Sequence, residues 1–382
     1  MNNYLKIGFS VLRLIAVPAL NFLTLSLGIK FLGKENWGAF ISVSIWIYFL
    51  VFITKWTGQN YLIKEFSKNP SKMYPLFYSN FIERSGFLVL AVFLFFGFPI
   101  PVALASSVLL ILIHIYSSFD SLIIYHQKFK LQFIAEIIGF FVLISSLFLM
   151  KKFDLILLIY FFCFSYLIKI GVLLFDLKLP FHGIALKINW RNSFQTFPFF
   201  LIGFSGWLDS RVDVYVVSYY FSKEKLAEYQ LLITSFLLLQ SFSGYLIIPF
   251  YKHFFRLSKK TIQKIKTKME LLAFPFVLVA TVAIWVVLEK IIDLNFSIYF
   301  YLIGGLSTIP SFYYAIDILQ LYRKDKEKTI VKISFVCITI NLILMVLLIP
   351  VFDILGVLLS VFILQWLYLF IIKREIKKLH FV

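Results

Sequence analysis

Residues 85–119 read SGFLVLAVFLFFGFPIPVALASSVLLILIHIYSSF, a run of 35 residues without a single Asp, Glu, Lys or Arg. A membrane-spanning helix needs about 20 mostly apolar residues, so this run is too long for one span and close to the length of two. Its middle holds the segment GFPIP at 97–101, and proline and glycine interrupt helices. The run therefore predicts two membrane helices joined by a tight turn.

Similar apolar segments recur along the whole chain. Of its 382 residues, 61% are hydrophobic and 15% are charged, whereas soluble domains are about half apolar and a quarter charged. No stretch long enough for a water-soluble domain remains between the segments. We therefore predict an all-α integral membrane protein with about twelve transmembrane helices. The predicted spans are residues 7–29, 37–58, 82–98, 101–119, 131–150, 153–174, 194–220, 228–250, 270–289, 294–316, 331–350 and 354–372.

The positions of the basic residues predict the topology of these spans. With the N-terminus in the cytoplasm, 26 of the 37 Lys and Arg residues fall in cytoplasmic segments, 7 fall in outer loops, and 4 lie within or at the edges of spans. Such an excess on the cytoplasmic side is typical of membrane proteins. Twelve spans then place the C-terminus in the cytoplasm as well. The net charge of +18 is explained by topology, and we expect no nucleic-acid partner.

A short repeat relates the two halves of the chain. Residues 32–40 (LGKENWGAF) and 221–229 (FSKEKLAEY) lie 189 positions apart, and Lys-Glu, a small residue and an aromatic residue fall in register. Both copies are predicted outer loops of the same orientation, although short loops can also match by chance. Parallel repeats occur in transporters. We predict two six-helix bundles, residues 1–190 and 191–382.

Three segments resemble bacterial polysaccharide-biosynthesis membrane proteins, the O-antigen and capsule lipid-linked oligosaccharide flippases. They are LGIKFLGKENWGAFISVSIWIYFLVF at 27–52, WTGQNYLIKEFSKNPSK at 56–72 and LDSRVDVYVVSYYFSKEKLAEYQLLITSF at 208–236. These flippases share a superfamily, and a MATE-like fold, with the MATE drug exporters and the lipid II flippases. Lipid II flippases generally carry two further spans, so the resemblance favours the O-antigen type.

The resemblance implies a transporter rather than an enzyme. Such a flippase moves an undecaprenyl-diphosphate-linked oligosaccharide, an O-antigen or capsule repeat unit, across the bacterial cytoplasmic (inner) membrane by alternating access. The implied partners are this lipid-linked oligosaccharide, a coupling ion (H+ or Na+), and the polymerase and chain-length proteins of lipopolysaccharide biosynthesis.

Two other functions remain open at this point. A multidrug exporter of the same fold would favour acidic over basic groups in its cavity, and both signs occur here. A membrane enzyme of polysaccharide assembly, such as an O-antigen polymerase, is expected to carry a large outer loop, which the predicted topology lacks.

Four basic residues are candidates for binding the diphosphate. Charged groups within hydrocarbon are costly, so each one is a candidate functional site. The resemblance implies basic side chains in a central cavity, and Arg13 in the first span and Arg211 in the seventh match that role best by position. The planar guanidinium gives paired hydrogen bonds to phosphate oxygens. Lys55 and Arg84 are further candidates, but they could be interface anchors, and Arg13 could extend to the head groups instead.

Three acidic residues are candidates for ion coupling or ion pairing. Asp209 and Asp213 are four residues apart and share one face of a straight helix, whereas Arg211 between them faces neither. The three could form a structural ion cluster or contact the substrate. Glu136 in the fifth span could be a proton or cation site, or could pair with a neighbouring helix.

We predict no catalytic residue, cofactor or metal site. The chain has no GxxxxGK[ST] run, so ATP is not expected to drive transport directly. Its two cysteines, Cys163 and Cys337, lie in apolar segments and are too few for a disulfide framework or a metal site. Energy would come from an ion gradient, the membrane potential or downhill consumption of the substrate.

Cysteine labelling tests the topology. In a chain whose Cys163 and Cys337 are replaced by Ala, a cysteine at Ser222 should react with a membrane-impermeant maleimide added to whole cells. A cysteine at Ser258 should react only after the membrane is permeabilised. Labelling of both positions from the same side would contradict the twelve-span topology.

Overall fold

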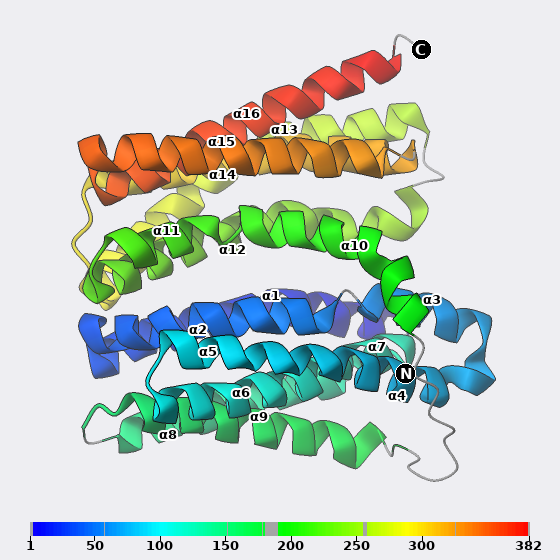
Figure 1. The fold of residues 1–382 in the computed structure, drawn as a ribbon. Coiled ribbons are helices and arrows are strands. Elements are labelled where there is room, and N and C mark those ends of the chain that lie inside the picture. Colours follow the sequence, from blue (N-terminus) through cyan, green and yellow to red (C-terminus); the bar gives the residue numbers. More distant parts are fainter. Residues whose placement is uncertain are drawn as a thin grey trace. The chain divides into compact units, whose positions relative to one another are not determined.

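In the computed structural model, every regular element of the described chain is a helix (Figure 1). The structure describes residues 3–380 except 57, 151, 178, 180–189, 255–257 and 325, and within helices it leaves out some side chains, chiefly those of 3–14, most of 191–199 and 246–254. A helix satisfies its backbone hydrogen bonds within one segment, as a chain in hydrocarbon requires. The predicted all-α class is therefore confirmed.

The chain divides into two compact units, Met1–Phe204 (unit 1) and Ser205–Val382 (unit 2). Unit 1 contains α1 (Asn3–Leu32), α2 (Lys34–Lys55), α3 (Gly58–Lys68), α4 (Met73–Ser85), α5 (Val92–Gly97), α6 (Ile100–Ser118), α7 (Asp120–Tyr125), α8 (Phe129–Leu149) and α9 (Leu155–Leu177). The next helix, α10 (Trp190–Asp209), begins in unit 1 and ends in unit 2. Unit 2 continues with α11 (Val212–Tyr220), α12 (Lys223–Phe254), α13 (Lys259–Val286), α14 (Ile298–Arg323), α15 (Glu327–Phe352) and α16 (Ile354–His380). The bundle boundary after residue 190 stays a prediction.

Ten helical segments of the described residues are long and apolar enough to cross a membrane. They are Ile15–Leu32, Lys34–Lys55, Pro70–Gly97, Ile100–Tyr125, Phe129–Leu149, Leu155–Leu177, Lys260–Ile291, Ile298–Arg323, Lys328–Phe352 and Ile354–Lys378. Each overlaps one of the predicted spans. The other two predicted spans, 194–220 and 228–250, fall on α10–α11 and α12, where part of the side chains is not described. The count of twelve and the cytoplasmic termini stay predictions.

The hairpin predicted from the 97–101 segment is present. α5 ends at Gly97, Phe98 is extended, and α6 begins at Ile100 after Pro99. The first helix of this hairpin starts earlier than predicted: α4 begins at Met73 and passes through the 3-10 turn Gly86–Ala91 into α5.

The predicted span 194–220 is not one continuous helix. α10 ends at Asp209 and α11 begins at Val212, with Arg211 in a non-helical conformation between them. Three polar residues in a row, Asp209, Ser210 and Arg211, stand at this break. The inference that Asp209 and Asp213 share a helix face assumed a straight helix through both residues, and the break removes that assumption.

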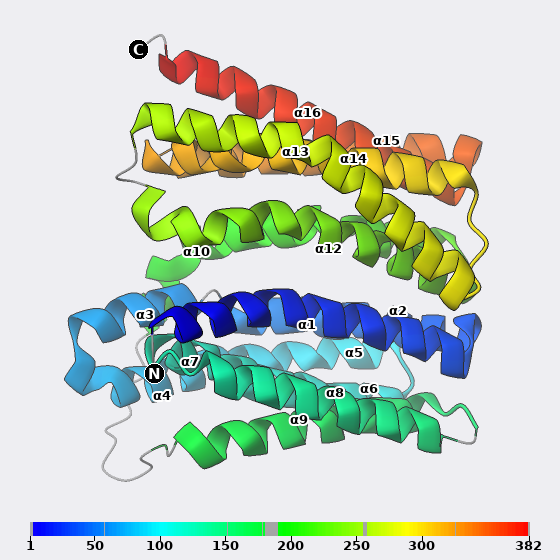
Figure 2. The same ribbon diagram turned by 180° about the vertical axis from the view of Figure 1, so that it is seen from behind.

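The same packing order recurs inside each unit. In unit 1, α1 packs on α8, α8 on α9, α9 on α6 and α6 on α2; the view from behind shows α1 lying along α8 (Figure 2). In unit 2, α11 packs on α15, α15 on α16, α16 on α14 and α14 on α12. Helices in corresponding places of the two halves thus make corresponding contacts.

The repeated sequence motif occupies equivalent positions in the two units, and its aromatic residue is buried in both. It opens α2 in unit 1 and α12 in unit 2. Phe40 and Tyr229, the aromatic residues in register, are 4% and 0% exposed. In the first copy, Gly33 has a φ of 82°, a left-handed conformation that favours glycine, and it forms the turn from α1 into α2.

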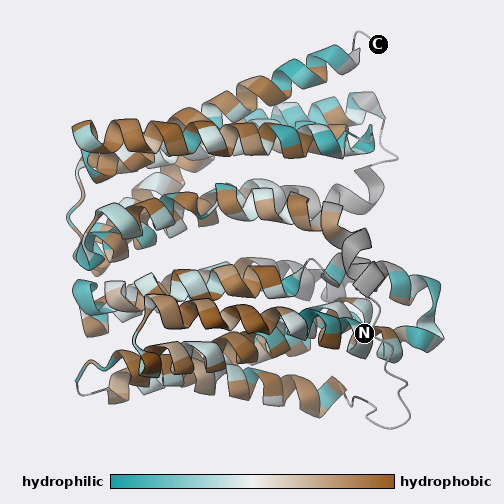
Figure 3. Cartoon of the chain, in the orientation of Figure 1, coloured by the Kyte–Doolittle hydropathy of each residue, from teal (hydrophilic) through white to brown (hydrophobic). Residues whose placement is uncertain are grey.

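Apolar side chains cover much of the outer surface of the helices. Hydrophobic residues run along most of their length, and hydrophilic residues gather toward their ends (Figure 3). Large apolar side chains such as Phe96, Leu149 and Leu271 are 83%, 77% and 76% exposed. An apolar surface of this extent marks contact with lipid rather than water. The chain is therefore a multi-pass membrane protein.

Candidate functional site

Arg84 lies in the interior of unit 1 and is 4% exposed. Its Nη1 donates a hydrogen bond to the Lys55 carbonyl oxygen at 3.2 Å, and its Nη2 donates to Ser118 Oγ at 3.1 Å. Lys55 is the last residue of α2, and carbonyl groups at a helix end lack partners within the helix. The guanidinium of Arg84 therefore caps α2 and ties it to α6.

His114 of α6 is fully buried beside Arg84's helix. Its Nε2 lies 3.1 Å from Ser85 Oγ, and its ring stacks on Phe81 with the centroids 5.4 Å apart. Within the described residues, neither His114 Nδ1 nor Arg84 Nε has a hydrogen-bond partner. Of the four basic candidates, the structure thus brings the Arg84 side chain against the backbone carbonyl of Lys55, whose own side chain is half-buried.

Glu136 pairs with two neighbouring helices. Its Oε2 lies 2.7 Å from Lys169 Nζ of α9, its Oε1 accepts a hydrogen bond from Tyr116 of α6 at 2.7 Å, and the Glu136 and Lys169 side chains are each 12% exposed. The Lys169 ammonium also lies 4.7 Å from the centroid of the Tyr166 ring. This is the geometry of interhelical pairing, one of the two roles considered for Glu136. A role in ion coupling stays a prediction.

A glycine makes the Glu136–Lys169 pair possible. The Lys169 stem crosses α8 directly over Gly139, where a Cβ would clash with it. A hydrogen bond joins the two helices at the same level: Ser165 Oγ of α9 donates to the Gly139 carbonyl oxygen of α8 at 2.7 Å. α8 and α9 are therefore held together by a polar contact that depends on their close approach.

Asp213 is the buried acid of unit 2. It is 4% exposed, its Oδ2 accepts a hydrogen bond from the Tyr229 hydroxyl at 2.7 Å, and its Oδ1 accepts from the Val214 amide at 2.8 Å. Arg211 is close enough to interact with Asp213 electrostatically, and Asp209 likewise lies near Asp213. The three candidates of this segment thus lie together, at the break between α10 and α11.

Arg13 is the one candidate whose side chain lies outside the described residues. Its backbone belongs to α1. The proposed roles of Arg13, Arg211, Lys55 and Arg84 in binding a diphosphate stay predictions.

The sequence analysis missed several partners in these clusters. Lys169 was counted only as one of the four basic residues within or at the edges of spans, and Tyr229 was noted only as the aromatic position of the repeat. Lys266 was assigned to a cytoplasmic loop, but it lies in α13 and its Nζ is 2.6 and 2.8 Å from the two carboxylate oxygens of Asp317, which is 0% exposed. Extending the helical periodicity upstream of residue 270 would have placed Lys266 on the face of Ile262 and Met269.

Within the described part of the chain, no group of three or more His, Cys, Asp or Glu side chains is placed to hold a metal ion. Cys163 and Cys337 are both free and buried.

Comparison with known proteins shows the fold. No protein-family model matches the sequence, and no curated protein matches it significantly. Among solved structures, "Lipid II flippase MurJ, inward closed conformation" matches with a TM-score of 0.67 and 16% sequence identity, over 97% of this chain and 87% of that chain. Nearly the whole chain therefore shares the fold of a lipid II flippase.

Breaking the buried ion pair should destabilise unit 1. Lys169→Ala leaves the Glu136 carboxylate buried without its cation, which should cost about 3–5 kcal/mol. The double variant Glu136→Gln/Lys169→Met leaves no buried charge behind. Its free energy of unfolding should therefore be closer to that of the wild type. Unfolding of the purified protein in detergent measures both.

The exposed pair Lys225–Asp353, at 2.6 Å with 43% and 59% of the side chains exposed, is the matched control. Lys225→Ala should cost less than about 1 kcal/mol, because solvent screens the pair. Equal losses of unfolding free energy for Lys169→Ala and Lys225→Ala would show that the buried pair contributes no more to stability than the exposed pair.

Proposed function

We propose that this protein is a flippase that moves an undecaprenyl-diphosphate-linked oligosaccharide, an O-antigen or capsule repeat unit, from the inner to the outer leaflet of the bacterial cytoplasmic membrane. The observation that carries the proposal is the fold, which matches a lipid II flippase over 97% of the chain. The choice of an oligosaccharide as the substrate rests on the resemblance of residues 27–52, 56–72 and 208–236 to flippases of the O-antigen type.

The recurring packing order supports transport by alternating access. Two units with corresponding internal contacts suit a mechanism in which each moves as a body. A flippase also leaves the lipid tail in the bilayer, so only the polar head has to cross. We propose H+ or Na+ as the coupling ion, with polymerase and chain-length proteins acting on the product.

The diphosphate requires cations within the membrane. A charge moved into a site of low dielectric constant is costly unless it is paired. Arg84 is already engaged with Lys55 and Ser118. Arg211 makes no ion pair within 4.0 Å with any residue of the described chain, so its guanidinium is better placed than that of Arg84 to accept a ligand. We propose Arg211 and Arg13 as the principal diphosphate-binding residues.

Complementation of a deletion strain tests the function. Loss of the gene should leave lipid-linked oligosaccharide in the cytoplasmic leaflet and remove surface polysaccharide, and the wild-type gene should restore it. A strain that keeps normal surface polysaccharide but becomes sensitive to drugs would favour a multidrug exporter instead.

The same assay ranks the arginine variants. Replacing Arg13 or Arg211 by Lys keeps the charge but loses the paired hydrogen bonds. Replacing either by Ala loses both and should lower transport roughly tenfold to hundredfold, since a hydrogen bond to a charged group contributes about 1.5–3 kcal/mol. The expected order is wild type, Arg→Lys, then Arg→Ala.

Membrane abundance is measured for each variant, and the exposed Arg374 serves as control, because Arg374→Ala should complement fully. Full polysaccharide with both Arg13→Ala and Arg211→Ala at normal abundance would place the diphosphate elsewhere.

A further inference from the structure

One face of α13 is fixed against α14. Ile262 and Met269 are 4% and 7% exposed and pack with Ile316 and Leu319 of α14. Lys266, on the same face, holds the buried Asp317. These contacts set the rotation of α13 about its axis, and they decide which side chains point away from the protein.

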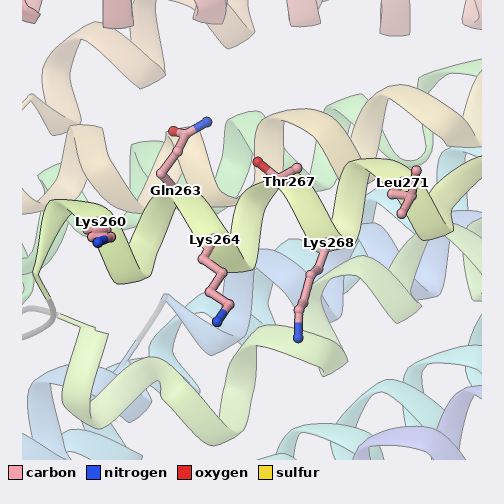
Figure 4. A pocket seen from close by; sticks show the side chains of 6 residues that line it. All are labelled: Lys260, Gln263, Lys264, Thr267, Lys268 and Leu271. Carbon is pink, nitrogen blue, oxygen red and sulfur yellow. The ribbon is translucent and has the colours of Figure 1, made fainter.

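The opposite face of α13 carries a row of lysines. Lys260, Lys264 and Lys268 are spaced four residues apart, as side chains on one helix face are, and all three are exposed. Together with Gln263, Thr267 and Leu271 they line an open hollow of about 440 Å³ (Figure 4). The Lys264 and Lys268 side chains extend to the same side of the helix in this view. None of the three makes an ion pair with a described residue.

The lysine row continues as an apolar row. Leu271, Leu278 and Val282 lie on the same face about one to four turns beyond Lys268, and they are 76%, 54% and 52% exposed. They belong to the candidate membrane span Lys260–Ile291. The face therefore changes along one helix from cations to apolar side chains, with the hollow lying at the change.

We propose that this face of α13 binds an anionic phospholipid of the cytoplasmic leaflet. The phosphate would lie against Lys260, Lys264 and Lys268, and an acyl chain would follow Leu271, Leu278 and Val282. The basic loops predict that this end of α13 is cytoplasmic, and basic residues directly beside a membrane span attract anionic head groups. The buried Lys266–Asp317 pair holds the row in the orientation that the lipid requires. The proposal does not depend on the transported substrate.

Lipid binding to the purified full-length protein in detergent tests the proposal. Native mass spectrometry compares phosphatidylglycerol with the zwitterionic phosphatidylcholine. The wild type should retain phosphatidylglycerol preferentially. The variant Lys260→Gln/Lys264→Gln/Lys268→Gln should lose this preference, with an affinity for phosphatidylglycerol lower by roughly a hundredfold, since each of the three lysines near a membrane contributes about fivefold. The corresponding triple Arg variant should retain it.

A second triple variant controls for charge alone. Lys324→Gln/Lys326→Gln/Lys328→Gln removes the same charge from exposed positions at the junction of α14 and α15, and it should bind phosphatidylglycerol as the wild type does. Equal binding by the α13 variant and the wild type, or an equal loss in both variants, would overturn the proposal. Binding of undecaprenyl diphosphate in place of phosphatidylglycerol would also overturn it, by assigning the row to a different lipid.

Discussion

Hydrocarbon offers no partner to a polar group, so a charge buried in this protein is costly unless another part of the protein or a ligand pairs with it. The structure meets this constraint with short contacts between helices. Lys169 pairs with Glu136 at 2.7 Å, and Lys266 pairs with Asp317 at 2.6 Å. These contacts also set how the helices lie: the first requires α8 and α9 to approach closely at Gly139, and the second sets the rotation of α13.

The architecture could be predicted from the sequence, because a membrane span is a local property. Length and hydropathy are sufficient to recognise a span, and the breaker segment at 97–101 correctly placed the turn between α5 and α6. The break at Arg211 could not be found in this way. Residues 194–220 are apolar enough on average to look like one helix, and the polar run at 209–211 was interpreted as a set of functional charges rather than as a helix end.

The polar contacts could be predicted only in part. Glu136 and Asp213 were recognised as candidates for ion coupling or ion pairing, but their partners Lys169 and Tyr229 lie 33 and 16 residues away. A partner at such a distance depends on which helices pack together, and single-sequence periodicity does not contain that information. Arg84 illustrates the same limit: its position near a span end suggested an interface anchor, whereas its guanidinium caps α2 in the interior.

The fold and the charges support the proposed function. Nearly the whole chain shares the fold of a lipid II flippase, each unit repeats the same order of helix packing, and Arg211 stands at the helix break without an ion pair among the described residues. Most other buried charges are occupied in holding helices together, which leaves few cations for a ligand. The proposed function requires that a lipid-linked diphosphate cross the membrane through this protein.

Transport by the purified protein in liposomes tests this requirement most directly. The liposomes carry an undecaprenyl-diphosphate-linked oligosaccharide in both leaflets, and a membrane-impermeant glycosidase is added outside. If the protein is a flippase, digestion should proceed beyond the outer-leaflet fraction toward completion, whereas protein-free liposomes stop at that fraction. Digestion that stops at the same fraction with and without the protein, under an imposed H+ or Na+ gradient as well, would contradict the account.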